Sequence, residues 1–417
     1  MKSWVKRALP WALYDWANSA FATTVMAAFV PVFNNRFWND GSGGTVAIDR
    51  LGTASSTAAI IVALLAPVIG AIADRGASKK RFLVAFAGLG ILATGSLAFA
   101  GQGQWAAALT LYVFAWIGFA GANVFYDSLI VAVADREKLD LVSALGFSLG
   151  YAGGGLLLAL NVLMATRPGM FGIGSAETAI RISFVMVACW WAVFSLPLLF
   201  RVKEPRTGPV LGIAESVRAG LRQLWNTFHE IRALRPIALF VLAYWFYIDG
   251  VHTVIQMAVA LGAARGFPET SLTVALLVTQ FVGFPAALAY GKLGERMGAR
   301  AGVLIAIVVY IGICLWGARM NTLREFYVLA MLVGLVQGGV QSLSRSLFAR
   351  LIPADKSGEF FGFYNMLGKF AAVLGPLLMA KATLWSGDDR VGILAIIPLF
   401  LLGGGILLAV RPAPASP

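Results

Sequence analysis

Twelve long apolar stretches, joined by short polar segments, make up most of this chain. A helix needs about 20 apolar residues to cross the hydrocarbon core of a bilayer, and these stretches have that length. We place the predicted spans near residues 9–33, 51–73, 82–101, 105–134, 141–165, 179–200, 236–262, 270–293, 301–319, 324–352, 358–383 and 391–411. Because helices satisfy their own backbone hydrogen bonds inside a membrane, the pattern predicts an all-α membrane protein with twelve transmembrane helices.

The composition argues against a separate soluble domain. The 417 residues are 59% hydrophobic and 13% charged, whereas a soluble domain has about 25% charged residues. Cys189 and Cys314 lie inside apolar spans, which argues against a disulfide framework, and only His229 and His252 could assist a metal site. We therefore expect no metal, no cofactor and no separate soluble domain. The first apolar run contains Asp15 and reads as a retained span rather than a cleavable signal peptide.

The distribution of basic residues predicts the orientation. A net charge of +13 would suggest nucleic acid as a partner of a soluble protein, but here the basic residues mark cytoplasmic loops. With the N-terminus in the cytoplasm, the inner segments hold 22 Lys and Arg residues and the outer segments 9. Both termini are thus expected in the cytoplasm. The lack of an N-x-[ST] sequon favours a bacterial inner-membrane protein.

The longest hydrophilic stretch, residues 201–235, lies midway along the chain. It separates a predicted six-helix bundle, residues 1–200, from a second one, residues 236–417. Apolar residues recur in it at helical spacing among arginines, which predicts an amphipathic helix on the cytoplasmic membrane face. A plain tether is the alternative.

The two halves resemble each other at three points in register. Residues 70–75 (GAIADR) and 291–296 (GKLGER) both follow the pattern G-x-x-x-[DE]-R, each after the second span of its half. Spans 1 and 7 carry a tyrosine just ahead of Asp15 and Asp249, and spans 4 and 10 place Asp127 and Arg345 before Ser-Leu. These matches predict two pseudo-symmetric six-helix bundles, with a substrate between them near the midplane.

The chain resembles the major facilitator superfamily through its doubled G-x-x-x-[DE]-R loop. More specifically, YDWANSAF at 14–21 is similar to the opening motif of the vacuole-effluxer (autophagy-related amino-acid exporter) family and its bacterial relatives. GYAGGG at 150–155, QGGVQSLSRSLFAR at 337–350 and EFFGFYNMLGKF at 359–370 also fit. The resemblance implies the major facilitator fold, in which spans 1, 4, 7 and 10 line a cavity, and a monomer. Fungal members export amino acids from the vacuole.

Five ionisable residues lie inside predicted spans: Asp15, Asp127, Asp249, Arg345 and Lys369. A charge at the bilayer centre costs about 2.5–3.5 kcal/mol on insertion scales, so such residues usually face a bundle interior or a cavity. Our first hypothesis is a cytoplasmic gate, in which Arg345 pairs with Asp127 or Asp15 across the two halves when the site opens outward. The resemblance implies further latches on the same side of the membrane: Asp74, Arg75, Glu295 and Arg296.

The second hypothesis concerns proton coupling. Asp249 is the deepest carboxylate and is our first candidate for a proton site, with Asp15 and Asp127 as further candidates. The alternative for Asp249 is a permanent pair with Lys369 that holds spans 7 and 11 together.

An amino-acid-like zwitterion needs a cation for its carboxylate and an anion or carbonyl groups for its ammonium. The predicted substrate-binding residues supply both kinds of charge and several uncharged polar groups: Asp15, Asn18, Asn123, Tyr126, Tyr247, Asp249, His252, Gln256, Gln341, Arg345, Asn365 and Lys369. His252 follows Asp249 by three residues, so both can share one helix face. A structural hydrogen bond to a neighbouring span is the alternative for His252.

Other classes fit less well. The Gly-Lys pair at 368–369 lacks the Ser/Thr and the glycine spacing of a phosphate loop, and no catalytic motif was found, so we expect no enzyme. A lipid or drug-like amphiphile transporter, or flippase, would favour a cavity with few charges. A sensor would normally carry a signalling domain. We therefore predict a secondary active transporter that works by alternating access and exports a small polar, amino-acid-like metabolite with protons as the coupling ion.

Overall fold

The computed structural model describes residues 3–42, 44–75, 79–204, 235–371 and 374–410, together with residues 215, 218, 219, 222, 225 and 226. At a few of these positions, among them Arg75 and Lys369, only the backbone is described. The predicted amphipathic helix within 201–235 falls mostly outside the described residues. Every regular element across the described ranges is a helix, which confirms the all-α prediction.

The first half of the chain forms the helices that we call the N half. Its long helices are α1 (Ser3–Ala20), α3 (Gly44–Arg75), α4 (Lys79–Ser96), α5 (Trp105–Ser128), α7 (Leu139–Thr166) and α8 (Ala176–Arg201). After α1 the first span continues through the π-helical segments η1 (Phe21–Phe29) and η2 (Asn34–Trp38), with the short α2 (Val30–Phe33) between them. The short α6 (Ile130–Val133) continues the line of α5.

The second half of the chain forms the C half. Its helices are α10 (Arg235–Ala264), α11 (Glu269–Met297), α12 (Ala299–Arg319), α13 (Leu323–Leu351), α14 (Ser357–Phe370), α15 (Leu374–Ser386), α16 (Asp389–Leu394) and α17 (Ile397–Ala409). Eleven helical runs in the described chain are long and apolar enough to cross a membrane. The predicted span 358–383 differs from these, because two shorter helices, α14 and α15, share its length.

Helix starts follow from local chemistry. Thr322 accepts a hydrogen bond from the backbone N–H of Glu325, whose side chain accepts one from the N–H of Thr322 in return. This capping box satisfies two backbone donors that the first turn of α13 would otherwise leave open. Ser175 caps α8 in the same way by accepting from the N–H of Thr178. At these two helices the preceding loop ends where a polar side chain replaces a missing backbone partner.

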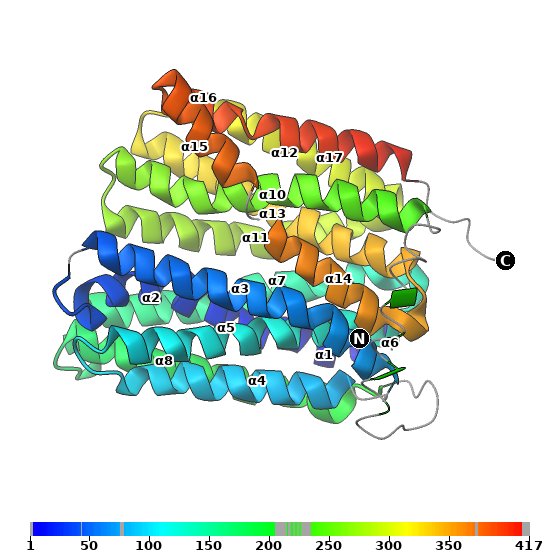
Figure 1. Cartoon of the computed structure of the whole chain (residues 1–417), viewed down its shortest axis with the longest axis horizontal. Coiled ribbons are helices and arrows are strands. Elements are labelled where there is room, and N and C mark those ends of the chain that lie inside the picture. Colours follow the sequence, from blue (N-terminus) through cyan, green and yellow to red (C-terminus); the bar gives the residue numbers. More distant parts are fainter. Residues whose placement is uncertain are drawn as a thin grey trace.

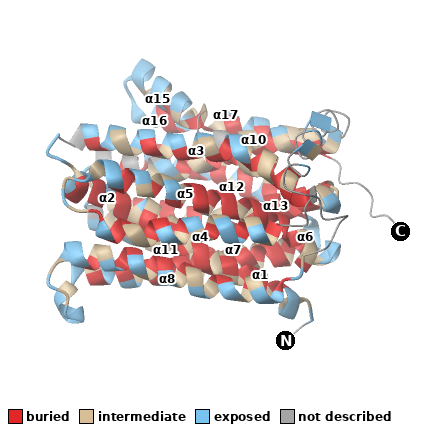
Figure 2. Cartoon of the chain, turned by 60° about the horizontal axis from the view of Figure 1, so that its bottom comes forward, coloured by how far each residue is buried: buried red, intermediate tan, exposed pale blue. Residues whose placement is uncertain are grey.

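The helices of each half lie together, and the two halves lie side by side (Figure 1). The start of α1 and the end of α17 lie at the same end of the bundle, on the right of Figure 1. We call this end the terminal face and the other end the opposite face. Buried residues concentrate inside the bundle, whereas apolar side chains such as Leu92 (73% exposed) and Val308 (67% exposed) cover its flanks (Figure 2). Such a flank matches the apolar bilayer core.

The halves approach each other closely near the terminal face, where α3 packs against α14 and α7 packs against α11. A Cβ atom placed on Gly70 of α3 would lie 2.3 Å from the carbonyl oxygen of Gly358 at the start of α14. Only glycine allows this backbone-to-backbone contact, and small residues drive helix packing in membranes in this way. The first glycine of the G-x-x-x-[DE]-R pattern therefore serves the interface between the halves.

Candidate functional site

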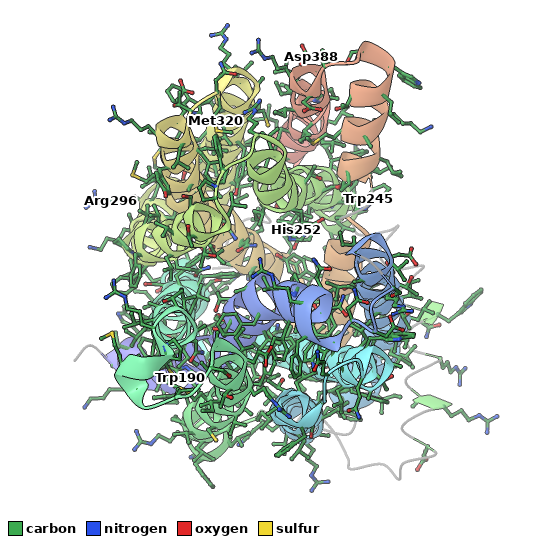
Figure 3. The ribbon with its side chains drawn as sticks, turned by 90° about the vertical axis from the view of Figure 1, so that its left-hand side faces the viewer. Trp190, Trp245, His252, Arg296, Met320 and Asp388 are labelled. Atoms are coloured by element: carbon green, nitrogen blue, oxygen red, sulfur yellow. The ribbon has the colours of Figure 1, made fainter. Side chains whose placement is uncertain are left out.

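A cavity of about 330 Å³ lies between the two halves, and it is lined by residues of α1, η1, α5, α7, α10, α11, α13 and α14. The polar side chains of its wall are Asp15, Asn18, Ser19, Thr23, Asn123, Tyr126, Asp127, Tyr151, Tyr244, His252, Gln280, Gln337, Gln341, Arg345, Tyr364 and Asn365. Seen from the opposite face, His252 lies near the centre of the molecule, between the helices of the two halves (Figure 3).

A second cavity of about 280 Å³ continues the first one toward the opposite face. The two share the wall residues Ala22, Thr23, Gln280 and Gln337. The rest of the second wall is mostly apolar and comes from η1 and from the halves of α10, α11 and α13 that lie nearer the opposite face. The site thus has a polar inner chamber and an apolar outer chamber.

Arg345 lies at the end of the inner chamber nearer the terminal face, between two carboxylates of the N half. Its Nη1 is 2.9 Å from Oδ1 of Asp127 and 3.5 Å from Oδ2 of Asp15. The Arg345 side chain is only 3% exposed, and the two carboxylate side chains are 12–13% exposed. Since α13 carries the arginine and α1 and α5 carry the acids, this cluster joins the halves, as the gate hypothesis requires.

Further hydrogen bonds support this cluster. Arg345 donates from Nε to Ser143 Oγ and from Nη2 to the Ser143 carbonyl oxygen, both at 2.9 Å. Tyr126 Oη donates to Asp15 Oδ2 at 2.6 Å, and Asn365 Nδ2 donates to Asp127 Oδ2 at 3.1 Å. A buried ion pair is tolerable only when such bonds replace the lost water.

Aromatic rings and one glycine shape the space around the guanidinium. Arg345 Cζ lies 4.3 Å from the ring centre of Phe147 and 4.9 Å from that of Trp11. Such cation–π contacts favour a desolvated cation. A Cβ on Gly146 would lie 2.6 Å from Asp15 Oδ2, 2.7 Å from Tyr126 Oη and 2.9 Å from Arg345 Nη2. Glycine at position 146 therefore gives the cluster the room it needs.

Most of the predicted substrate-binding residues line this cavity. They are Asp15, Asn18, Asn123, Tyr126, His252, Gln341, Arg345 and Asn365. Asn18 Nδ2 donates to Asn123 Oδ1 at 2.5 Å, so these two amides of the N half orient each other. Their part in substrate binding stays a prediction.

Three predicted residues lie elsewhere. Tyr247 is fully buried within the C half, where its hydroxyl shares a 2.7 Å hydrogen bond with Ser344 Oγ. Gln256 is exposed and does not line the inner chamber. Tyr244 lines the chamber in place of Tyr247, because the lining face of α10 follows the helical repeat 244, 248, 252. The Lys369 side chain lies outside what the structure describes.

Asp249 is the third residue outside the chamber, and its partners are backbone groups. Its carboxylate accepts hydrogen bonds from the N–H groups of Leu374 and Gly375, both at 3.0 Å. These are the first residues of α15, so Asp249 satisfies backbone donors that the break between α14 and α15 leaves open. A Cβ on Gly375 would lie 1.9 Å from Thr253 Oγ1, which fixes glycine there.

Sequence reasoning missed several wall residues: Ser19, Thr23, Tyr151, Tyr244, Gln280, Gln337 and Tyr364. Ser19 and Gln337 lie one helical turn from Asp15 and Gln341, so extending the predicted faces by four residues would have found them. Gln280 belongs to span 8 and Tyr151 to span 5, and neither is among the four spans that the resemblance places at the cavity. Ser143, the arginine's other partner, also belongs to span 5.

The terminal face is closed by polar contacts between the halves. Asp74 at the end of α3 accepts from the backbone N–H of Gly358 at 3.0 Å and from that of Glu359 at 2.7 Å. It also pairs with Lys79 Nζ at 2.7 Å, and this lysine donates to Ser357 Oγ. A carboxylate at a helix start is favourable, because the first amides and the helix dipole both attract it. Asp74 thereby ties α3 to the start of α14.

Polar contacts at the same face also join α7 to the C half. Arg350 donates from both Nη atoms to the buried Asp140, at 2.6 and 2.9 Å. Beside it, Lys138 forms an ion pair with Glu295, the acid of the second G-x-x-x-[DE]-R pattern. Arg296 is exposed and extends away from the bundle (Figure 3). The Arg75 side chain is not described, so the predicted latch role rests on Asp74 and Glu295.

The arrangement of helices and cavity defines a class of protein. The fold is similar to that of the human organic anion transporter MFSD10 (TETRAN), with a TM-score of 0.73 and 16% identity over 98% of this chain and 100% of that one. Two helical halves around a central polar cavity are thus the fold that the chain shares with this transporter.

The sequence relatives identify the family. The chain is 38% identical to the "uncharacterized MFS-type transporter YxiO" of Bacillus subtilis (strain 168), over 100% of this chain and 97% of that protein. The model of the "Vacuole effluxer Atg22 like" family matches residues 52–139 and 131–413, and the chain belongs to this family. Autophagy-related protein 22 of Yarrowia lipolytica is 27% identical over 67% of this chain, which spans about half (52%) of that relative. The predicted fold and family are confirmed.

Proposed function

We propose that this transporter moves a small, zwitterionic, amino-acid-like metabolite out of the cell by alternating access, with protons as the coupling ion. The observation that carries the proposal is the position of Arg345 between Asp15 and Asp127 at the inner end of the central cavity. This cluster is at once the charged part of the cavity wall and a contact that holds the halves together.

The chemistry of the inner chamber supports a zwitterion. Arg345 can receive a carboxylate, Asp15 can receive an ammonium group, and the surrounding amides and phenols can bond to uncharged polar atoms. A volume of about 330 Å³ suits a small metabolite. A substrate carboxylate that competes with Asp127 for Arg345 would weaken the contact between α5 and α13. Binding would thereby favour opening of the terminal face.

The proposed orientation places the terminal face in the cytoplasm, as the distribution of basic residues predicts. In that orientation the structure corresponds to an outward-facing state, because the polar contacts of Asp74, Asp140 and Arg345 join the halves toward the terminal face and the cavity continues toward the opposite face. Rocking of the N half against the C half would break the contacts of Asp74, Asp140 and Arg345 and open the cytoplasmic side.

The balance of charge in the cluster supports proton coupling. Two carboxylates, Asp15 and Asp127, share one guanidinium, so one negative charge is in excess when both are ionised. A proton on either acid would neutralise this excess and change the strength of the latch. Asp15 and Asp127 are therefore our candidates for the coupling site, ahead of Asp249, whose carboxylate caps α15.

One observation favours a second candidate, a transporter of amphiphiles. The outer chamber has an apolar wall, with side chains such as Ile255, Leu272 and Val333. It could hold an alkyl or aromatic group while the inner chamber binds a polar head. A drug-like amphiphile or lipid would then compete with the amino acid for the site.

Counterflow in proteoliposomes tests the proposal. Vesicles with reconstituted protein are loaded with one unlabelled amino acid, dipeptide or amphiphile, and uptake of the same labelled compound is followed. We expect counterflow of amino acids and its loss in Arg345→Gln. Counterflow of amphiphiles alone would favour the second candidate, and counterflow of neither class would contradict both.

Proton coupling needs a separate arm. An imposed pH gradient should drive net flux in the wild type, whereas Asp127→Asn should keep counterflow but lose the response to pH. Asp15→Asn also removes the proposed partner of the ammonium group, so its counterflow should fall together with its response to pH. Asp49→Asn, which removes an exposed carboxylate outside the cavity, is the matched control. An unchanged pH response in both cavity variants would exclude these acids as coupling sites.

A further inference from the structure

The flank of the N half carries a groove of about 820 Å³ between α1 and α8, at the terminal face. Its wall consists of Lys6, Leu9, Pro10, Leu13, Val193, Leu196, Pro197, Phe200 and Arg201. The two helices pack against each other at the edge of the molecule, along the bottom of Figure 2. This groove is separate from the central cavity, with which it shares no lining residue.

Charge and apolar surface are segregated along the groove. Lys6 and Arg201, both exposed, stand at the end nearest the terminal face. From there the groove runs past apolar side chains to Leu13 and Val193, seven and eight residues further along their helices, or about 10–12 Å. Phe200 is 80% exposed and Val193 is 56% exposed, so this wall faces the bilayer rather than the core.

Two prolines contribute to the shape of the groove. Pro10 follows Lys6 by four residues, and Pro197 precedes Arg201 by four, so the two rings lie at similar depths on antiparallel helices. Each proline lacks the N–H that would bond to the preceding turn, which removes one backbone bond on either side of the groove. Their compact side chains keep the groove open, whereas longer side chains would fill it.

The two cations have no protein counter-charge among the described residues. The neighbouring Arg7 differs, because it forms an ion pair with Asp135. Lys6 and Arg201 form no ion pair or hydrogen bond with a described residue, and the described groove wall contains no acid. An anionic group at this level would therefore complete the site.

We propose that this groove binds an anionic phospholipid of the membrane leaflet at the terminal face. Lys6 and Arg201 would hold the phosphate-bearing headgroup, and the apolar floor between α1 and α8 would hold the first carbons of an acyl chain. Basic pockets between transmembrane helices bind anionic headgroups in this way, and the cytoplasmic leaflet is the one that supplies such lipids. The assignment to that leaflet rests on the proposed orientation, but not on the proposed substrate.

Native mass spectrometry of the full-length protein in detergent tests this inference. Phosphatidylglycerol and phosphatidylcholine are titrated at equal concentrations, and the bound lipids are counted. We expect phosphatidylglycerol to bind preferentially to the wild type, and its affinity to fall about ten- to thirty-fold in Lys6→Gln/Arg201→Gln. The control Lys292→Gln/Arg296→Gln removes two exposed cations at the same face, on α11, and should bind as the wild type does.

Two further variants separate loss of the site from loss of the fold. Lys6→Arg/Arg201→Lys keeps both charges and should keep the preference, whereas Leu196→Trp keeps the cations but fills the groove and should weaken binding. Equal binding of the two lipids, or equal losses in the double Gln variant and its control, would overturn the inference. A dimer that dissociates in the double Gln variant at constant lipid count would assign the groove to a second copy of the chain instead.

Discussion

Arg345 Nη1 lies 2.9 Å from Asp127 Oδ1, and this single contact crosses the boundary between the C half and the N half. Both side chains are largely removed from water. If the halves separated, each would keep a charge without its partner, and breaking a buried pair by removing one member costs about 3–5 kcal/mol. The pair therefore has two stable conditions, joined or hydrated, and it can act as a latch between two conformations.

Replacement of Arg345 should release this latch. In Arg345→Gln, the C half loses the cation that holds Asp15 and Asp127 of the N half, so we expect the terminal face to open more often. Reactivity of a cysteine at the buried Ser128, in a background with Cys189→Ser and Cys314→Ala, should rise at least ten-fold. Arg345→Lys retains the charge but not the forked geometry, and it should give an intermediate rate. Unchanged labelling in Arg345→Gln would mean that other contacts hold the face closed.

Gly146→Ala should disturb the same cluster without changing its charge. The added methyl group would meet Asp15, Tyr126 and Arg345 at 2.6–2.9 Å, and overpacking of this kind costs about 1–3 kcal/mol. We expect a lower melting temperature in detergent and a loss of counterflow. Gly88→Ala is the matched control, because a Cβ there meets nothing within 4 Å. Equal melting temperatures and transport rates for the two variants would show that the cluster tolerates displacement.

The residues of this cluster could be predicted from the sequence because charges inside a membrane need partners. Asp15, Asp127 and Arg345 lie at similar depths on spans 1, 4 and 10. Few pairings are therefore possible for the arginine, and both acids are among them. The fold was predictable for a related reason, since twelve apolar spans and a doubled loop pattern leave few alternatives.

The partners of Asp249 could not be predicted in the same way. Its depth suggested a cavity residue or a partner of Lys369, whereas the structure places backbone amides of α15 against it. A free backbone N–H cannot be recognised from residue types unless the sequence signals the end of a helix. Gly375-Pro376, within a predicted span, is such a signal. Gln280 was not predicted as a wall residue for another reason, because span 8 was not expected to line the cavity.

The ion pair between Lys138 and Glu295 should contribute weakly to closure of the terminal face, and swapping its two charges should preserve that contribution. Both side chains are about one-third exposed, so we expect the pair to contribute no more than about 1 kcal/mol. Lys138→Glu should increase terminal-face labelling a few-fold by placing two acids together. The double variant Lys138→Glu/Glu295→Lys should restore the wild-type rate. A double variant that labels as fast as the single one would show that the two residues do not interact in the closed state.

Asp249 can be assigned to structure or to coupling by comparing two variants. Asp249→Asn removes one acceptor and turns an amide N–H₂ toward a backbone N–H, which should cost about 1–3 kcal/mol of stability. Gly375→Ala places a methyl group 1.9 Å from Thr253 Oγ1 and disrupts the same cap while the carboxylate remains. If Asp249 only holds the start of α15, both variants should lower the melting temperature, and the pH dependence of the remaining flux should match that of the wild type. The inner chamber is lined without Asp249, so the substrate Kd should change less than about three-fold in both. A loss of pH-driven flux confined to Asp249→Asn would instead make this buried carboxylate part of the proton pathway, because only that variant removes an ionisable group.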